Sequence, residues 1–226
     1  MSSQHSNNSM LISYMLLRKI IGCLGILLPV VLAAGGLIYA NCTSIQSSIS
    51  DYYHTEMRNI FVGTLCAVAL FMFAYKGHDK RDKIAGNLAC IFALGVAFFP
   101  TKVDVLSECA TECIDYKPWI NIVHFTSAFL FFVVLIYFSL VLFPKTHNTT
   151  GPLSVEKKQR NRVYKISGYT MIVSIVLIAV FIFFFKEDKT LQQLDPVFWL
   201  EAIALLAFGI SWLTKGQFLY GDKELE

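Results

Sequence analysis

The chain has 226 residues, of which 55% are hydrophobic and only 15% are charged, and its formal net charge is +3. Soluble domains carry roughly 25% charged residues, so this composition excludes an ordinary soluble domain. The mean hydropathy of +0.56 indicates an integral membrane protein that crosses the bilayer several times. So small a net charge gives no reason to expect a nucleic-acid partner.

Six apolar segments follow one another along the chain. A helix needs about 20 apolar residues to cross roughly 30 Å of hydrocarbon, and a shorter run can borrow a polar turn from its flanks. The six runs cover residues 20–39, 59–75, 84–99, 119–143, 166–185 and 197–214. The first run is longer than the apolar core of a cleavable signal peptide, so we expect it to be retained. We predict an all-α, polytopic membrane bundle of six transmembrane helices over 20–214, with polar tails at 1–19 and 215–226.

The basic residues predict how this bundle is oriented. Lysine and arginine in short loops favour the cytoplasmic side of a membrane. If the N-terminus is cytoplasmic, fourteen of the 19 lysines and arginines fall in cytoplasmic segments and five in outer ones. Both termini are therefore predicted to be cytoplasmic. The sequence shows no long targeting segment, which favours a bacterial inner membrane.

Three of the six cysteines, Cys42, Cys109 and Cys113, fall in the outer segments of this topology. A disulfide between two of them would form in an oxidising compartment. The spacing of Cys109 and Cys113 also suggests half of a metal site, but no second thiol pair or neighbouring histidine accompanies them. We therefore favour a disulfide or free thiols, and the sequence leaves the pairing open.

Two ionisable residues are exceptions to the apolar character of the six runs. Glu201 is the only acidic residue and His124 the only histidine within them. An ionisable group in hydrocarbon costs several kcal/mol, so such residues usually face the interior of the bundle and serve a purpose. Both lie about five residues from the outer end of their runs, which is roughly 7 Å at the helical rise. We therefore expect them at one depth on one side.

The polar stretch SISDYYHTEMRNIFVG at 48–63 supplies partners for them. If the second helix begins near Ser50, then Asp51, His54 and Arg58 lie on one of its faces, because residues three, four and seven apart share a helix face. The fourth run offers a matching stripe of polar residues. Together they predict a pocket near the outer leaflet, formed by Ser50, Asp51, His54, Arg58, Asn121, His124, Ser127 and Glu201.

The same residues also have a purely structural interpretation. The polar stretch would then be a solvated membrane interface with local ion pairs, and Glu201 and His124 would form one interhelical hydrogen bond. We favour the pocket for the set that includes Glu201 and His124, and the structural interpretation for Asp51 or His54 taken alone.

If the pocket is functional, it predicts a lipid-directed hydrolase or transferase. His54, Asp51, His124 and Glu201 are the candidate catalytic residues, and they have the ligand chemistry of a Zn²⁺ site that activates water. Without metal, His54 or His124 would act as general base beside Asp51. Ser50, Arg58, Asn121 and Ser127 would bind the ligand.

The sequence contains no HExxH, GxSxG or paired CxxC motif, each of which would identify one enzyme class. The alternative function is therefore a non-catalytic lipid-binding, sterol-binding or scaffold protein of the membrane. We expect membrane lipid to be the partner in both cases. A transporter is less favoured, because the inner halves of the runs hold few polar residues.

Four short motifs resemble a known group of membrane proteins. They are ISD at 49–51, KGHDKRDKIAGNLA at 76–89, FFPT at 98–101 and VHFTSAFLFFVVLIYFSLVL at 123–142. Together they resemble the six-span DRAM/Frag/Sfk-type proteins and the related bacterial membrane proteins of a domain of unknown function. The match covers about the first four runs.

In that group an ISD-type motif precedes the second span, and a histidine followed by small residues opens the fourth. Here the histidine is His124, followed by Ser127 and Ala128. The segment DYYHTEMRN departs from the group's pattern, so the resemblance implies nothing about His54 and Arg58. Eukaryotic members are linked to autophagy and to the remodelling of lipid anchors, so the resemblance implies lipid as the ligand class.

Overall fold

The computed structural model describes residues 2–75, 77, 79–102, 109, 117–145 and 153–220, with side chains described from residue 14 onward. Every regular element in this part of the chain is a helix. The α-helices are α1 (Ser2–Ile38), α2 (Arg58–Ala74), α3 (Lys80–Phe98), α4 (Pro118–Tyr137), α5 (Val155–Val180), α6 (Lys189–Gln192) and α7 (Pro196–Lys215). A 3₁₀ turn, η1 (Ser50–His54), precedes α2, and two π-helical turns, η2 (Phe138–Leu142) and η3 (Phe181–Phe185), continue α4 and α5.

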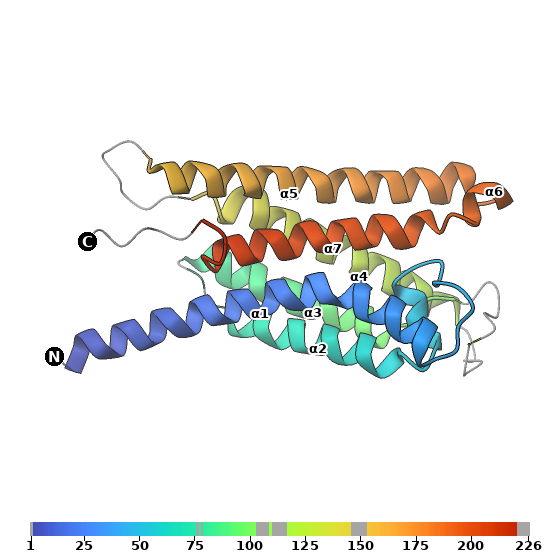
Figure 1. Cartoon of the computed structure of the whole chain (residues 1–226), viewed down its shortest axis with the longest axis horizontal. Coiled ribbons are helices and arrows are strands. Elements are labelled where there is room, and N and C mark those ends of the chain that lie inside the picture. The colour runs from blue at the N-terminus through green and yellow to red at the C-terminus, as the bar shows by residue number, and fades with distance from the viewer. Residues whose placement is uncertain are drawn as a thin grey trace.

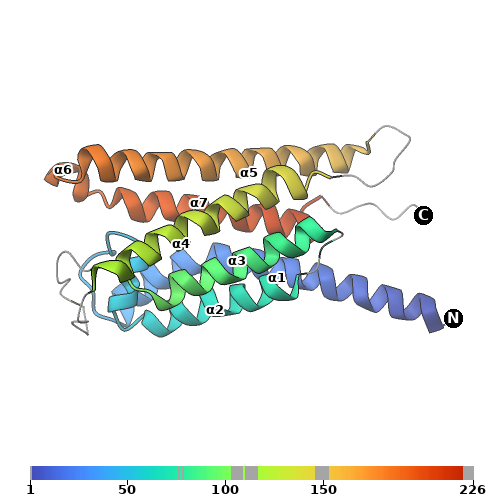
Figure 2. The ribbon, with the colours of Figure 1, turned by 180° about the vertical axis from the view of Figure 1, so that it is seen from behind.

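The long helices run side by side along one axis (Figure 1). α7 packs against both α1 and α5, while α3 lies between α2 and α4. α5 forms one edge of the bundle in both views (Figure 2). The start of α1 and the end of α7 share one end, which we call the terminal end. η1, α6 and the connection between α1 and α2 share the opposite end, which we call the loop end.

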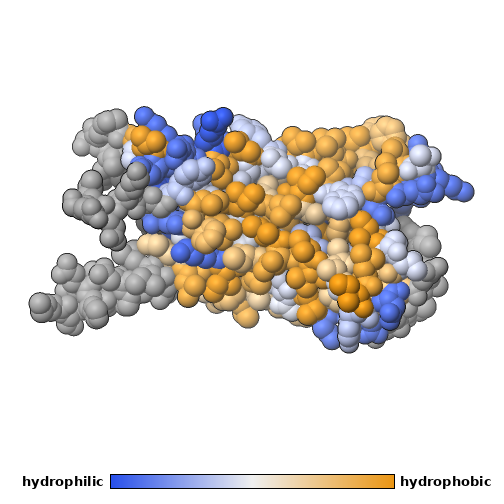
Figure 3. Space-filling model, viewed as in Figure 1, coloured by the Kyte–Doolittle hydropathy of each residue, from blue (hydrophilic) through white to orange (hydrophobic). Residues whose placement is uncertain are grey.

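Four helical segments are each long and apolar enough to cross a membrane: Tyr14–Ile38, Pro118–Leu142, Val155–Phe185 and Pro196–Lys215. α2 is apolar but has only 17 residues, and α3 begins with a charged turn. On the face that Figure 3 shows, hydrophobic residues cover the middle of the molecule and hydrophilic ones gather toward its two ends. The prediction of a helical membrane protein is therefore confirmed, and these four helices carry it.

Two helices begin earlier than the hydropathy predicts. The segment 1–19 was predicted to be a polar tail, but α1 is helical from Ser2. α5 begins at Val155, eleven residues or about three helical turns before the apolar run at 166–185, because the Ser154 side chain accepts a hydrogen bond from the Lys157 backbone N–H and caps the helix. Hydropathy locates the part of a helix that suits hydrocarbon, and charged turns can extend it on either side.

α1 and α7 approach each other through two glycines. A Cβ atom on Gly209 would lie 2.6 Å from the Gly22 carbonyl oxygen, and one on Gly22 would lie 2.8 Å from the Gly209 carbonyl oxygen. Small residues let helix backbones come this close in a bilayer, where dispersion contacts replace the hydrophobic effect as the force that joins helices. The pair therefore sets the distance between the first and the last helix.

We expect Gly209→Ala to lower the unfolding temperature, because the added methyl group would push backbone against backbone. Overpacking of this kind costs about 1–3 kcal/mol. The matched control is Gly63→Ala on α2, where an added Cβ meets nothing within 4 Å. Thermal unfolding in detergent should separate the two variants, and equal stability would contradict this account of the α1–α7 contact.

Candidate functional site

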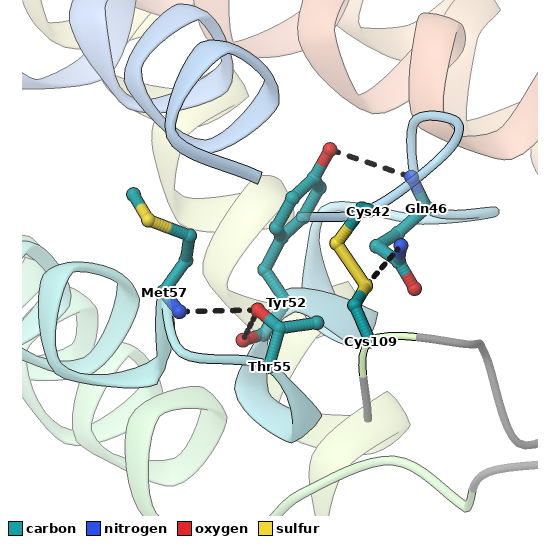
Figure 4. Close-up of a disulfide and its surroundings, with 6 residues drawn as sticks. All are labelled: Cys42, Gln46, Tyr52, Thr55, Met57 and Cys109. Carbon is teal, nitrogen blue, oxygen red and sulfur yellow. Dashed lines mark hydrogen bonds between the residues drawn. A yellow bond between two sulfur atoms is a disulfide. The ribbon is translucent and has the colours of Figure 1, made fainter. Parts of the chain in front are cut away.

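The connection between α1 and α2 covers the loop end and is fastened there by a disulfide. Cys42 and Cys109 form this bond, with their Cα atoms 5.1 Å apart. Figure 4 shows Gln46 beside it: the side-chain amide donates a hydrogen bond to Cys109 Sγ (3.4 Å) and the backbone N–H donates to the Tyr52 hydroxyl (3.3 Å). The predicted disulfide is thus confirmed as a pairing of Cys42 with Cys109, and Cys113 lies outside the described residues.

η1 does not have the helical form that the sequence predicted near Ser50. It is a single 3₁₀ turn, and Thr55 after it is extended (φ −113°, ψ 174°). The Thr55 hydroxyl donates to the Tyr52 carbonyl (2.9 Å) and accepts from the Met57 backbone N–H (3.1 Å), as Figure 4 shows. These bonds end the turn and delay α2 to Arg58. The predicted helical stripe of Asp51, His54 and Arg58 is therefore not formed.

Arg58 interacts with a neighbouring aromatic ring. Its guanidinium carbon lies 4.4 Å from the centre of the Tyr53 ring, and its Nη2 donates to the Tyr53 hydroxyl (2.8 Å). A guanidinium over an aromatic face is a favourable contact at a membrane interface. Arg58, which was predicted to bind the ligand, therefore stabilises η1 through Tyr53.

Ser50 and His124 place a hydroxyl group beside an imidazole ring. Ser50 Oγ lies 3.0 Å from His124 Nε2, and His124 Nδ1 lies 2.6 Å from the Phe99 carbonyl oxygen. A carbonyl oxygen can only accept a hydrogen bond, so His124 Nδ1 carries a proton and donates a hydrogen bond to the Phe99 carbonyl oxygen. In the neutral imidazole Nε2 is then the acceptor, and Ser50 donates to it. Ser50 and His124 are 9% and 2% exposed, so bulk water is largely excluded from the pair.

Asp51 and His54 meet through Thr101, which follows α3. The Thr101 hydroxyl donates to Asp51 Oδ1 (3.2 Å), and the Thr101 carbonyl accepts from His54 Nε2 (2.9 Å). Burial raises the pKa of Asp51, and the hydrogen bonds from Ser48 and Thr101 and the nearby His54 oppose that rise. Asp51 therefore lies next to Ser50 along the chain, but its carboxylate binds Thr101 and takes no part in the hydrogen bond between Ser50 and His124.

Glu201 binds the backbone of the connection. Its Oε2 accepts a hydrogen bond from the Ile49 backbone N–H (2.7 Å), and the Phe198 N–H donates to the Ser47 carbonyl (3.0 Å). The start of α7 therefore holds residues 47–49 in place next to η1. The interhelical hydrogen bond between Glu201 and His124, which was the structural alternative, is not formed.

The remaining two predicted ligand-binding residues lie at the edge of the cluster. Asn121 Oδ1 accepts from the Lys102 backbone N–H (3.1 Å), which fixes the chain that leaves α3. Ser127 lies about one helical turn beyond His124 and is buried against Gly95 of α3. Both residues therefore position α4 against α3.

A comparison with family models matches residues 21–215, from α1 to the end of α7, to a protein of unknown function, DUF998. The chain belongs to the DUF998 family. No curated protein and no solved structure matches it. The resemblance to bacterial membrane proteins of a domain of unknown function is thus confirmed, while that to the DRAM/Frag/Sfk-type proteins stays a prediction.

The predicted zinc site is not formed in this DUF998 protein. Among the described residues no three histidine, cysteine, aspartate or glutamate side chains are placed to hold a metal ion. The physical reason is that the four candidate ligands bind different partners. His124 binds Ser50 and Phe99, His54 and Asp51 bind Thr101, and Glu201 binds Ile49. The residues present therefore do not fit the metal.

The site of this DUF998 protein also depends on groups that the sequence did not indicate. The carbonyls of Phe99 and Thr101 and the N–H of Ile49 each bind a candidate side chain. Backbone groups have no residue type of their own, so no pattern identifies them. The Thr101 hydroxyl is the exception, since it lies within the FFPT motif at 98–101.

We expect Glu201→Leu to destabilise the loop end, because it leaves the buried Ile49 N–H without an acceptor. An unsatisfied buried donor costs about 1–3 kcal/mol. Glu201→Gln is the matched control, since its amide oxygen keeps an acceptor at the same reach. Thermal unfolding and the rate of proteolysis between α1 and α2 should show the loss for leucine only. If Glu201→Gln lost as much stability as Glu201→Leu, the effect would come from the carboxylate charge and not from the missing acceptor.

Proposed function

We propose that this protein is a six-span enzyme of a bacterial inner membrane that cleaves or transfers acyl esters of outer-leaflet lipids, with Ser50 as nucleophile and His124 as general base. The observation that carries the proposal is the alignment of Ser50 Oγ, the His124 ring and the Phe99 carbonyl, at 3.0 and 2.6 Å. A nucleophile bonded to a base, with the base oriented by a third group, is the recurring arrangement for acyl transfer.

The topology is supported by both ends of the bundle. The terminal end holds the start of α1, the end of α7 and the basic start of α5, which the positive-inside tendency favours on the cytoplasmic side. The loop end holds the disulfide, which favours an oxidising outer side. α2 and α3 have 17 and 19 residues, which is about 26 and 29 Å of helix, close to the thickness of the hydrocarbon.

We expect two engineered cysteines, one in the first turns of α5 and one beyond η3, to differ in whether they are labelled from outside the cell. Gln159→Cys near the start of α5 would be protected from a membrane-impermeant maleimide in intact cells, and Glu187→Cys beyond η3 would be labelled. Both positions are exposed, and Cys113 would be replaced beforehand together with Cys23, Cys66 and Cys90, which are free thiols in the described part of the chain. Labelling of both, or of Gln159→Cys alone, would contradict the proposed orientation.

The proposed reaction needs only the groups of this pair. Ser50 Oγ attacks the ester carbonyl while its proton moves to His124 Nε2, which then gives that proton to the departing alkoxide oxygen. The C–O bond of the ester breaks and an acyl group remains on Ser50. Water, or the hydroxyl of a second lipid, then attacks this acyl group while His124 takes its proton. The bond between the acyl group and Ser50 Oγ breaks, and His124 returns the proton to Ser50 Oγ. Hydrolysis and transfer differ only in that final acceptor.

The depth of the pair favours a lipid substrate. His124 is in the second turn of α4, about 9 Å from its start at the helical rise, which is where the ester groups of a glycerolipid lie beneath their head groups. Ile122 and Phe125 on either side of it are 66% and 51% exposed. An ester would therefore reach the pair from the bilayer along α4, which keeps the acyl chains out of water.

We expect Ser50→Ala and His124→Gln each to reduce the cleavage of fluorogenic lipid esters by about 10²-fold or more, since general-base catalysis contributes 10²–10⁴-fold. Ser50→Ala should also abolish labelling by a lipid-like fluorophosphonate. Ser47→Ala is the matched control, because Ser47 lies in the same connection with its side chain exposed. Unchanged turnover or labelling in Ser50→Ala would rule the proposal out.

The second candidate is a non-catalytic lipid-binding or scaffold protein, and one observation favours it. The polar side chains of the loop end are bonded largely to backbone groups of neighbouring segments, as His124 is to Phe99 and Glu201 to Ile49. They would then serve to hold the connection on the bundle. In that case the wild-type protein would turn over no lipid ester, while Ser50→Ala and His124→Gln would lower the unfolding temperature.

A further inference from the structure

A second polar feature lies toward the terminal end, on the outside of α5. A shallow groove of about 360 Å³ runs along this helix and is lined by Lys158, Asn161, Arg162, Lys165, Ile166 and Tyr169. The spacing of these residues places them along one face of α5. We call this feature the α5 groove. It shares no residue with the candidate site at the loop end.

The groove changes from charged to apolar along its length. Its three cationic side chains come first, followed by Ile166 and Tyr169, which are 57% and 61% exposed, and then by Val173, which is 55% exposed. α5 with η3 is the least buried of the four apolar spans. The groove therefore crosses from the surface of the membrane into the region where acyl chains lie.

Two cations close to the groove along the chain have partners of their own. Lys145 pairs with Asp79 (2.9 Å), and Arg160 donates to the Tyr220 carbonyl (2.7 Å). Within the described part of the chain the side chains of Lys158, Arg162 and Lys165 make no hydrogen bond, ion pair or ring contact. Three uncompensated positive charges within two turns of one helix are complementary to an anion.

Asn161 adds a polar group to the same groove. Its Oδ1 atom is buried and has no hydrogen-bond partner in the structure, and a rotation of the half-buried side chain would turn this oxygen toward the groove. An unsatisfied acceptor of this kind costs free energy unless a ligand supplies a donor. A ligand that fits would therefore carry a negative charge next to a hydroxyl or ammonium group, and apolar chains beyond it.

We infer that the α5 groove binds an anionic phospholipid of the membrane: the phosphodiester lies among Lys158, Arg162 and Lys165, a hydroxyl of the head group donates to Asn161, and an acyl chain follows Ile166 and Tyr169. Lysines and arginines close to the membrane surface attract anionic lipids, and each of them adds to the attraction. The unpaired state of these three cations then has a physical purpose. The inference stands independently of the reaction proposed for Ser50 and His124.

The test measures binding of phosphatidylglycerol to the full-length protein in detergent by native mass spectrometry, with phosphatidylcholine as the neutral lipid. The variant K158Q/R162Q/K165Q should bind phosphatidylglycerol at least about tenfold more weakly. The matched control K80Q/R81Q/K83Q removes the same charge from three exposed residues at the start of α3. It should change the affinity less than twofold, and both variants should keep the wild-type unfolding temperature.

Each other outcome overturns the inference. An equal loss in the two variants would show a general attraction of the basic end for anionic lipid. Displacement of phosphatidylglycerol by millimolar inorganic phosphate would show that the groove takes free phosphate. Equal binding of phosphatidylcholine would show that the phosphodiester charge is not recognised. Asn161→Leu provides an independent check: it should remove the preference for phosphatidylglycerol over phosphatidic acid, which lacks the head-group hydroxyls.

Discussion

The buried part of a segment that covers the end of a helical bundle has to satisfy its backbone groups within the protein, and this constraint determines the loop end. The connection between α1 and α2 has no regular pairing of its own, apart from the single turn η1. Its N–H and carbonyl groups are bonded by α7 at Ile49 and Ser47, and by side chains within the connection itself at Met57 and Gln46. An unpaired buried group would cost about 1–3 kcal/mol, so the position of Glu201 in an apolar helix follows from the hydrogen bond that the Ile49 backbone requires.

The fold was predictable from the sequence where its physical cause is local. The length of an apolar run predicts a helix, and the runs identified the six long helices with errors confined to their ends. The early start of α5 depends on Ser154 as a cap, and that of α1 on a polar stretch without apolar periodicity, so hydropathy could locate neither. Glycine pairs such as Gly22 and Gly209 bring helices together, yet no single sequence tells which glycines face each other.

The candidate site was only half predictable for a related reason. Ser50 and His124 could be found because a hydroxyl and an imidazole are conspicuous beside apolar runs, and they do meet. The predicted helical stripe failed because Thr55 bonds its own backbone neighbours and ends η1 after one turn. Histidine and carboxylate side chains can be counted in a sequence, but their partners here are largely peptide groups. The four ionisable side chains consequently lie in one region without sharing a ligand.

The disulfide changes the covalent connectivity of the chain. Cys42 and Cys109 are 67 positions apart, and the bond between them closes a covalent ring that includes all of α2 and α3. A single cut of the main chain anywhere inside that ring would leave one connected molecule, because the disulfide would still link the piece that carries α1 to the piece that carries α7. The helices outside the ring, α1 and α4 to α7, have no such safeguard. The two parts of the bundle therefore differ in how they would survive a cut of the main chain.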